Sequence, residues 1–417
     1  LRLAGGLAMA PGLSEFDALG RMQALADANR PAGRDLVCFA GAGAYDHEIP
    51  AAVRSLAFRS EFVTAYTPYQ PEVAQGVLQA LFEYQTMVAR LFGLPVANAS
   101  LYDGATACVE AANLASAATG RSRIWISRGL HPHWREVVRT FAAGTGHELA
   151  DVPLRDGRTA WDGAPAPGTP SGAGSGPAAL LVQHPNHLGC MEDLAAAAGV
   201  ARRHGALLLV AFDPVAAGLL RPPGSYGADV VVGEGQPFGT PLSLGGPYLG
   251  LFACGTDHVR RLPGRLVGET VDTEGRRAYV TTLRAREQDI RREKASSNVC
   301  TNQTLIAVCC AVQMAWLGTG GLRELALRCA RGTRYTRDAL LGIDGVEPVA
   351  EAPVLREFAV RTPIAAEAVV ERMAEEGFLA GVPLPPELGD GLLVAVTERR
   401  TREEIDAYVT AFEKVIR

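Results

Sequence analysis

The stretch Gly233-Glu-Gly-Gln-Pro-Phe-Gly-Thr-Pro-Leu-Ser-Leu-Gly-Gly-Pro-Tyr-Leu-Gly250 joins two short apolar runs, 229–232 and 249–253. Apolar runs of this length, bounded by Gly and Pro, are typical of buried strands. Glycine lets the backbone approach a neighbouring group closely. The loop therefore suits a binding site, and it also suits a plain surface turn; composition alone leaves both readings open.

This loop lacks a lysine. In a large class of α/β enzymes, a lysine in such a loop holds pyridoxal phosphate as a Schiff base. The whole chain contains two lysines, Lys294 and Lys414. Because Lys294 follows a charge-dense segment, we expect it to be a surface or interface charge and not a buried nucleophile.

Outward from the loop, apolar runs alternate with helical patterns between about 95 and 320, which is the signature of a mostly parallel sheet covered by helices. We predict strands at 123–127, 178–183, 207–212, 230–233 and 249–253, and helices at 14–29, 75–93, 105–119, 132–142, 193–204 and 301–317. After a helix at 321–341, strands at 357–361 and 392–396 and helices at 365–376 and 401–415 indicate a small α+β domain. The predicted division is an N-terminal arm (1–75), a large α/β domain (76–320) and a small C-terminal α+β domain (321–417).

The amino-acid composition argues against several classes of partner. The chain has 417 residues, 48% hydrophobic and 20% charged, with a net charge of -5. These values fit a soluble globular protein and make nucleic acid an improbable partner. No signal peptide or membrane-length apolar run is evident, so we expect a cytoplasmic protein. The eight cysteines form no C-x-x-C pair and predict buried thiols without a metal; His131 and His133, which could share a strand face, are weak evidence for one.

Several polar residues stand at element ends. Asp213 follows strand 207–212, where an aspartate could pair with a pyridine nitrogen or cap the next turn. His184, in His184-Pro-Asn-His187, follows strand 178–183, and open α/β sheets place their sites at such ends. Asp103 precedes helix 105–119 and is expected to cap the N–H groups that could otherwise hold phosphate.

Three further segments are unusual in composition. Tyr66-Thr-Pro-Tyr-Gln-Pro-Glu72 cannot lie inside a helix, and its tyrosines suit a pocket, an interface or a packed arm. The segment 265–302 is dense in charge and predicts a solvated helix with pairs such as Glu287 and Arg291. Residues 157–177, rich in Gly, Pro, Ala and Ser, predict a mobile surface loop.

Five ordered motifs resemble the glycine cleavage system P-protein family, and more closely the homologue of its N-terminal half found in split forms of the enzyme. They are Thr64–Glu72, Ala97–Ala107, Gly233–Pro237, Gly245–Gly250 and Arg284–Asn298. The resemblance implies a fold-type I architecture of pyridoxal-phosphate-dependent transferases, which is aminotransferase-like, with a large domain and a small C-terminal domain.

In the catalytic half of that family, the loop reads H-K-T-F-x-x-P and closes with G-G-P. Aligning G-G-P on Gly245, Gly246 and Pro247 places Phe238 and Pro241 on the family's residues and the lysine on Gln236. Glutamine cannot form an imine with an aldehyde. The resemblance thus implies that this chain binds no pyridoxal phosphate covalently and that a homologous subunit 2 carries it, with Asp213 as a relic or a structural residue.

The implied activity is an oxidoreductase step of glycine catabolism. With subunit 2, the chain would decarboxylate glycine and pass the aminomethyl group to the lipoyl arm of the H-protein. The resemblance assigns no definite catalytic residue to this chain. The pocket or interface candidates are Tyr66, Thr67, Tyr69, Gln70, His184, Asp213, Glu234, Gln236 and Arg286.

Some features depart from the family pattern, namely His184, His187, Cys190 and the segment 157–177. They leave two alternatives open. One is a specialised paralogue that acts with another partner on a different amino acid in secondary metabolism. The other is a non-catalytic scaffold that only stabilises its partner.

Overall fold

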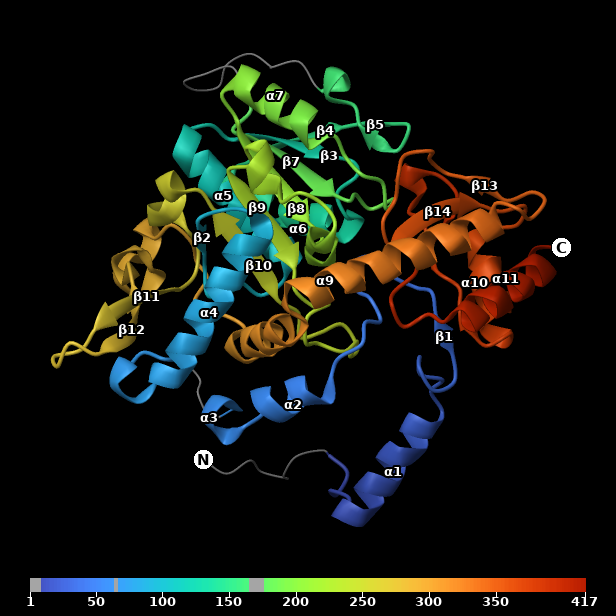
Figure 1. Cartoon of the computed structure of the whole chain (residues 1–417), viewed down its shortest axis with the longest axis horizontal. Helices are drawn as coiled ribbons and strands as arrows, with labels where there is room; N and C mark the ends of the chain where they lie inside the picture. The colour runs from blue at the N-terminus through green and yellow to red at the C-terminus, as the bar shows by residue number, and fades with distance from the viewer. Residues whose placement is uncertain (1–8, 64–66, 165–175) are drawn as a thin grey trace.

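The computed structural model describes residues 9–63, 67–164 and 176–417. Its centre is a seven-stranded sheet in the order β2-β10-β9-β8-β7-β3-β4 (Figure 1). The strands are β2 (Val96–Ala97), β3 (Arg123–Ser127), β4 (Glu148–Val152), β7 (Ala179–His184), β8 (Leu207–Phe212), β9 (Val230–Glu234) and β10 (Gly250–Cys254). Strands β3, β4, β7, β8 and β9 pair in parallel. The predicted mostly parallel sheet is confirmed.

Strand β10 runs antiparallel to β9 and β2. It follows β9 through the loop 235–249, which contains no crossover helix, and a parallel pair needs such a crossover. The Gly- and Pro-rich loop 235–249 therefore returns the chain beside the strand it has just left, at the carboxyl end of β9.

Helices cover both faces of this sheet. Alternate side chains of one strand enter opposite cores, as the two-residue period of a strand requires. In β8, Leu208 and Val210 join the core under α4 (Gln75–Phe92), α7 (Leu194–His204) and α9 (Thr304–Leu340), whereas Leu209 and Ala211 join the core under α5 (Gly104–Thr119) and α6 (Pro132–Thr145).

The small domain holds a four-stranded sheet in the order β13-β14-β17-β16. Its strands are β13 (Glu347–Pro348), β14 (Glu357–Arg361), β16 (Val382–Pro383) and β17 (Leu392–Ala395), and its helices are α10 (Ala366–Glu375) and α11 (Arg402–Ile416). The arm is fastened to this domain, because β1 (Val37–Cys38) pairs with β15 (Phe378–Leu379) and Phe39 stacks on Tyr408 with ring centroids 3.9 Å apart.

The arm itself begins with α1 (Glu15–Asp27), which Ser14 caps by accepting the Asp17 N–H at 3.1 Å. Two short helices follow, α2 (Ala51–Ala57) and α3 (Ser60–Val63), which the sequence did not predict. The 3-10 turn Pro71–Val73 then leads into α4.

The prediction for residues 265–302 was wrong. Strands β11 (Leu266–Val271) and β12 (Arg277–Thr282) form a hairpin, and short turns follow at Arg284–Arg286, Gln288–Arg291 and Arg292–Lys294. Gln85 of α4 explains the hairpin's position, because its amide donates to the carbonyl of Val267 and accepts that residue's N–H, both at 2.9 Å.

The helices predicted at 301–317 and 321–341 are one element, α9, interrupted at Gly318 (φ 58°, ψ -174°). Among the helices of the described residues, α9 is the one that is long and apolar enough to cross a membrane, a property that core helices of soluble proteins share. In its most apolar window, 39% of the residues are buried.

Three smaller expectations need correction. His131 and His133 do not share a strand face: His131 caps α6 and His133 lies in its first turn. The segment 157–177 is not a loop throughout, because Arg158–Thr159 pairs with Leu154–Arg155 and a 3-10 turn follows at Trp161–Gly163; residues 165–175 lie outside the described part. Seven cysteines are buried as predicted, but Cys300 is exposed.

Gly189 joins the two domains by close backbone contact, and this contact is testable. Gly189 has φ +78°, and an added Cβ would lie 1.9 Å from the carbonyl oxygen of Glu357 in β14. We expect Gly189→Ala to lower the free energy of unfolding by more than about 3 kcal/mol. The matched control is Gly120→Ala, at φ +68° with no atom within 4 Å of the added Cβ, which should cost about 1–2 kcal/mol. Equal urea midpoints for the two variants would contradict the contact.

Candidate functional site

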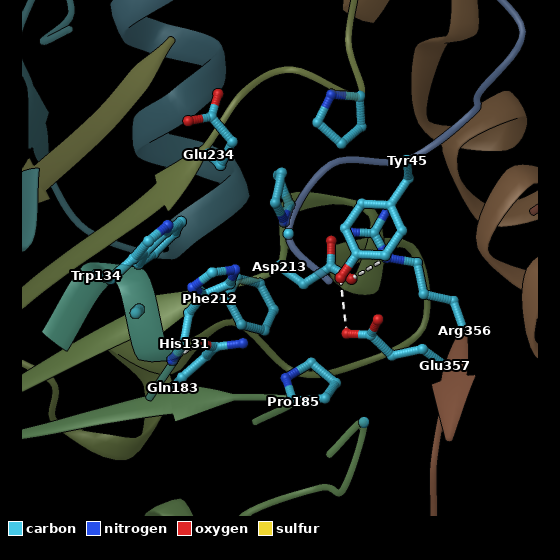
Figure 2. Close-up of a pocket in the computed structure, with 15 residues that line it drawn as sticks. Tyr45, His131, Trp134, Gln183, Pro185, Phe212, Asp213, Glu234, Arg356 and Glu357 are labelled. Carbon is cyan, nitrogen blue, oxygen red and sulfur yellow. Dashed lines mark hydrogen bonds and ion pairs between the residues drawn. The ribbon is translucent and has the colours of Figure 1, made fainter. Parts of the chain in front are cut away.

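A small cavity lies at the carboxyl ends of β7, β8 and β9, against the small domain (Figure 2). Its volume is about 40 Å³. The side chains that decide its chemistry come from the arm (Tyr45), from the residue after β8 and the end of β9 (Asp213 and Glu234), from the N-cap of α6 (His131), and from the residue before β14 and its first residue (Arg356 and Glu357). The site thus stands where open α/β sheets bind their ligands.

Asp213 is committed to an ion pair. Its Oδ2 lies 2.8 Å from Nε of Arg356, and its Oδ1 accepts the Val215 N–H at 3.0 Å. The Arg356 guanidinium also lies under the Tyr45 ring, with its carbon 3.4 Å from the ring centroid. Burial alone would lower the pKa of Arg356, but Asp213, Tyr45 and Glu357 more than compensate, and the pKa is raised. The aspartate therefore faces a permanent cation supplied by the chain itself.

Glu357 stands beside this pair. Its carboxyl accepts the Tyr45 hydroxyl at 2.7 Å and the Ala42 N–H at 3.2 Å. Burial raises the pKa of Glu357 to about 7, although the hydrogen bond from Tyr45 and the charge of Arg356 lower it. The group can therefore change its charge near neutral pH.

Glu234 covers the start of α5. Its carboxyl accepts three backbone N–H groups, from Gly104 at 2.9 Å, Gln236 at 2.9 Å and Leu249 at 2.8 Å. Asp103 accepts the Thr106 N–H at 2.7 Å in a capping box, which confirms the predicted cap. The carboxyl groups of Glu234 and Asp103 thus take the Gly104 and Thr106 N–H groups, two of the donors that a helix start would offer to a phosphate.

Gln236 is buried behind the cavity wall. Its Oε1 accepts the N–H of Tyr45 at 3.1 Å, and its Nε2 donates to the carbonyls of Tyr45 at 3.1 Å and Thr240 at 2.7 Å. Its amide therefore clamps the backbone of Tyr45, so that the position aligned with the family's lysine holds the arm in place.

The histidines support the structure. His184 Nδ1 accepts the Glu192 N–H at 3.1 Å, the ring stacks on Phe212, and burial lowers the pKa of His184 to about 4. The cavity is lined by Gln183 and Pro185, the chain neighbours of His184.

A second cluster has side chains close enough together to hold a metal ion: His47, Cys329 and Glu398. However, His47 already contacts Glu398 at 2.7 Å and Arg356 at 2.6 Å, and the positive charge of the Arg356 guanidinium opposes a cation there.

The remaining predicted residues gather elsewhere, around Arg265. Its Nη2 donates to the Tyr69 hydroxyl at 2.8 Å and the Cys300 carbonyl at 2.9 Å, and its Nη1 donates to Thr67 Oγ1 at 3.4 Å. The guanidinium carbons of Arg265 and Arg284 lie 4.8 Å and 5.2 Å from the centroid of the Tyr69 ring, which is 43% exposed. We call Thr67, Tyr69, Arg265 and Arg284 the arginine cluster.

Arg286 and Gln70 border this cluster. Arg286 donates to the carbonyls of Leu262 and Gly264, so it braces the loop before Arg265, and burial lowers its pKa. Gln70 is exposed beside Tyr69, and Tyr66 lies outside the described residues. The structure therefore separates the candidates into two places: Asp213 and Glu234 at the cavity, with Gln236 behind it, and Thr67, Tyr69, Gln70 and Arg286 at or beside the cluster.

Sequence reasoning missed Tyr45, Arg356 and Glu357. One signal was present, because Arg356-Glu357 interrupts the apolar run Val354–Val360, and buried charges in a strand need partners. Nothing in the local sequence indicated that Tyr45, more than 300 residues earlier, would be that partner.

Comparisons with known proteins agree over nearly the whole chain. Residues 1–412 match the family model described as glycine cleavage system P-protein. The chain is 48% identical to the probable glycine dehydrogenase (decarboxylating) subunit 1 of Moorella thermoacetica, covering 100% of this chain and 92% of that protein, and 46% identical to the protein of the same name from Desulforamulus reducens, covering 97% and 90%.

Solved structures also match this chain over nearly its whole length. A crystal structure of glycine decarboxylase (P-protein) of the glycine cleavage system, in inhibitor-bound form, superposes with a TM-score of 0.92 at 45% identity, covering 99% of this chain and 92% of that one. A sphingosine-1-phosphate lyase from Burkholderia pseudomallei superposes with a TM-score of 0.69 at 15% identity, which shows the fold alone. The predicted fold-type I architecture is confirmed.

The pKa of Glu357 gives a pH test. Because burial raises its folded pKa to about 7 from 4.5, Glu357 stabilises the fold below about pH 4.5, and this contribution is lost as pH rises through 7. Relative to Glu357→Gln, the wild type should lose stability between pH 5 and 7.5, by about 1.4 kcal/mol for each unit of pKa shift. Urea unfolding of both proteins across this range measures the difference; parallel curves would refute it.

Proposed function

Because the chain belongs to the glycine cleavage system P-protein family, we propose that it is subunit 1 of a two-subunit glycine decarboxylase. It acts with a homologous, lysine-bearing subunit 2, decarboxylates glycine and passes the aminomethyl group to the lipoyl arm of the H-protein. Pyridoxal phosphate, bound by the partner, supplies the electron sink for the carbanion. We place the complex in the cytoplasm, where the chain's thiols stay reduced.

One observation carries the assignment of the cofactor to the partner: the lysine position, two N–H groups of the helix start and the strand-end aspartate are already engaged. Gln236 replaces the lysine and clamps Tyr45. Glu234 and Asp103 take N–H groups of the first turn of α5. Asp213 is paired with Arg356. The residues present do not fit the cofactor.

We propose that this chain contributes to turnover through the arginine cluster. Tyrosine and arginine are enriched at the centres of protein interfaces. Here two guanidinium groups flank a half-exposed tyrosine ring, and the family motifs 64–72 and 284–298 meet at that point. We propose that this surface faces subunit 2 and shapes its pocket or the channel for the lipoyl arm.

Reconstitution tests the division of labour. The chain, mixed with pyridoxal phosphate and treated with borohydride, should keep no cofactor absorbance after denaturation, since Gln236 cannot form the linkage. With subunit 2 and lipoylated H-protein, glycine-dependent release of carbon dioxide should appear. A borohydride-fixed cofactor on this chain alone would overturn the proposal, and a panel of amino acids in the same assay shows whether another substrate is preferred.

Substitution of Tyr69 distinguishes a subunit that helps to form the active site from one that is only a scaffold. We expect Tyr69→Ala to lower kcat of the assembled complex roughly tenfold or more, because the ring positions two arginines. Tyr69→Phe, which loses only the hydrogen bond to Arg265, should have a smaller effect.

The matched control is Tyr335→Ala, which removes a tyrosine that is also partly exposed and also lies under an arginine, Arg402 at 5.3 Å, but in α9 beside the small domain. It should leave kcat unchanged. If Tyr69→Ala forms the complex and turns over like wild type, the chain is a scaffold.

A further inference from the structure

A second, larger cavity opens on the large domain, with a volume of about 500 Å³. It lies between the hairpin of β5 (Leu154–Arg155) and β6 (Arg158–Thr159), the turn Trp161–Gly163 and helix α7. It shares no lining residue with the cavity of Figure 2. Figure 1 shows β5 and α7 at the top of the molecule, whereas the hairpin β11–β12, which leads to the arginine cluster, lies at the lower left. Pockets of about 300–1,000 Å³ are the size that holds small molecules.

A buried carboxyl group fixes the two walls of this cavity to each other. Glu192, two residues before α7, accepts the N–H of Thr159 in β6 at 2.9 Å and the Thr159 hydroxyl at 2.8 Å. The side-chain amide of Asn186 donates to the same carboxyl at 2.8 Å. The hairpin and the start of α7 therefore keep a fixed relation, and the cavity between them has a defined shape.

The carboxylates that line the cavity are all engaged within the chain. Glu192 takes the three hydrogen bonds just described. Asp162 pairs with Arg155 at 2.9 Å, and Asp193 caps α7 by accepting the Ala196 N–H at 2.9 Å. None of them is left to neutralise a further cation.

Two arginines that line the same cavity have no such partner. Within the described residues, Arg158 of β6 and Arg203 of α7 form no ion pair. The parts of the chain outside the described residues contain no Asp or Glu. Nη1 of Arg203 lies 3.7 Å from the place of a Cβ added to Gly199, another lining residue, so its guanidinium folds back over the cavity wall. The cavity thus offers two positive charges from two walls.

We propose that this cavity binds a small phosphate monoester. Such a group carries a charge of about −1.5 to −2 at pH 7, which matches two guanidinium groups better than a single carboxylate does. The planar fork of arginine also fits phosphate oxygens. Trp161, which lines the cavity as well, supplies a flat apolar surface for the organic part of the ligand. The site goes beyond the proposed function and does not depend on subunit 2.

Isothermal titration calorimetry of the purified full-length chain tests the site. The probe is adenosine 5′-monophosphate, because it joins a phosphate monoester to a planar ring. It should bind with a Kd below about 1 mM at physiological salt. Adenosine, which lacks the phosphate, and inorganic phosphate, which lacks the ring, should each bind roughly tenfold more weakly or less.

Substitutions locate the binding. Arg158→Gln and Arg203→Gln should each raise the Kd of the probe roughly tenfold, because each removes a charged donor to the phosphate. The matched control is Arg202→Gln, which removes an exposed arginine of α7 that does not line the cavity and should leave the Kd unchanged. Ala196→Phe keeps both arginines but adds a ring at an exposed position of the cavity wall, and it should also weaken binding.

Three outcomes would overturn the proposal: no binding of the probe to the wild type; equal affinity for the probe and inorganic phosphate, which would indicate an adventitious anion only; and equal effects of Arg203→Gln and Arg202→Gln. Urea midpoints check that the variants fold, which we expect because the three arginines are exposed. The decarboxylation assay reports on a different part of the molecule, so failure here and failure of the proposed function are separate results.

Discussion

The buried guanidinium of Arg356 is the group on which the arrangement of this chain depends. It pairs with Asp213 of the large domain, stacks under Tyr45 of the arm and contacts His47, which in turn contacts Glu398. A buried charge is tolerated only when it is paired and hydrogen-bonded. Because Arg356 lies in the small domain and its three partners lie in the large domain and the arm, satisfying one cation sets the positions of the arm and both domains together.

Under the proposed division of labour, this constraint explains how the fold can persist in a subunit that does not hold the cofactor. In pyridoxal phosphate enzymes, the cofactor would meet the aspartate at the strand end and the N–H groups at the helix start. In this chain, side chains make those links: Arg356 faces the aspartate, Glu234 binds the N–H of the first residue of α5, and Gln236 holds the backbone of Tyr45.

The buried elements could be predicted from the sequence, and the contacts between distant residues could not. Strands 123–127 and 207–212 match β3 and β8, because strands buried on both faces read as continuous apolar runs. The cap at Asp103 could be predicted because an aspartate just before a helix accepts the free N–H groups of its first turn. The hairpin β11–β12 was missed because its strands lack a clear alternation of apolar and polar residues. Its hydrogen bonds to α4 also come from Gln85, which lies 182 residues before Val267 in the chain. Arg356 was missed for the same reason: only the fold brings it to Asp213 and Tyr45.

The clamp at Gln236 has an evolutionary consequence. Restoring a lysine at this position would remove the Oε1 acceptor that holds the Tyr45 N–H, while Glu234 would still cover the helix start and Arg356 would still occupy the aspartate. A single reversion would therefore lose stability and regain no chemistry. Changes that are each harmful unless the others come first are hard to reverse, so on the proposed function this subunit stays dependent on its lysine-bearing partner.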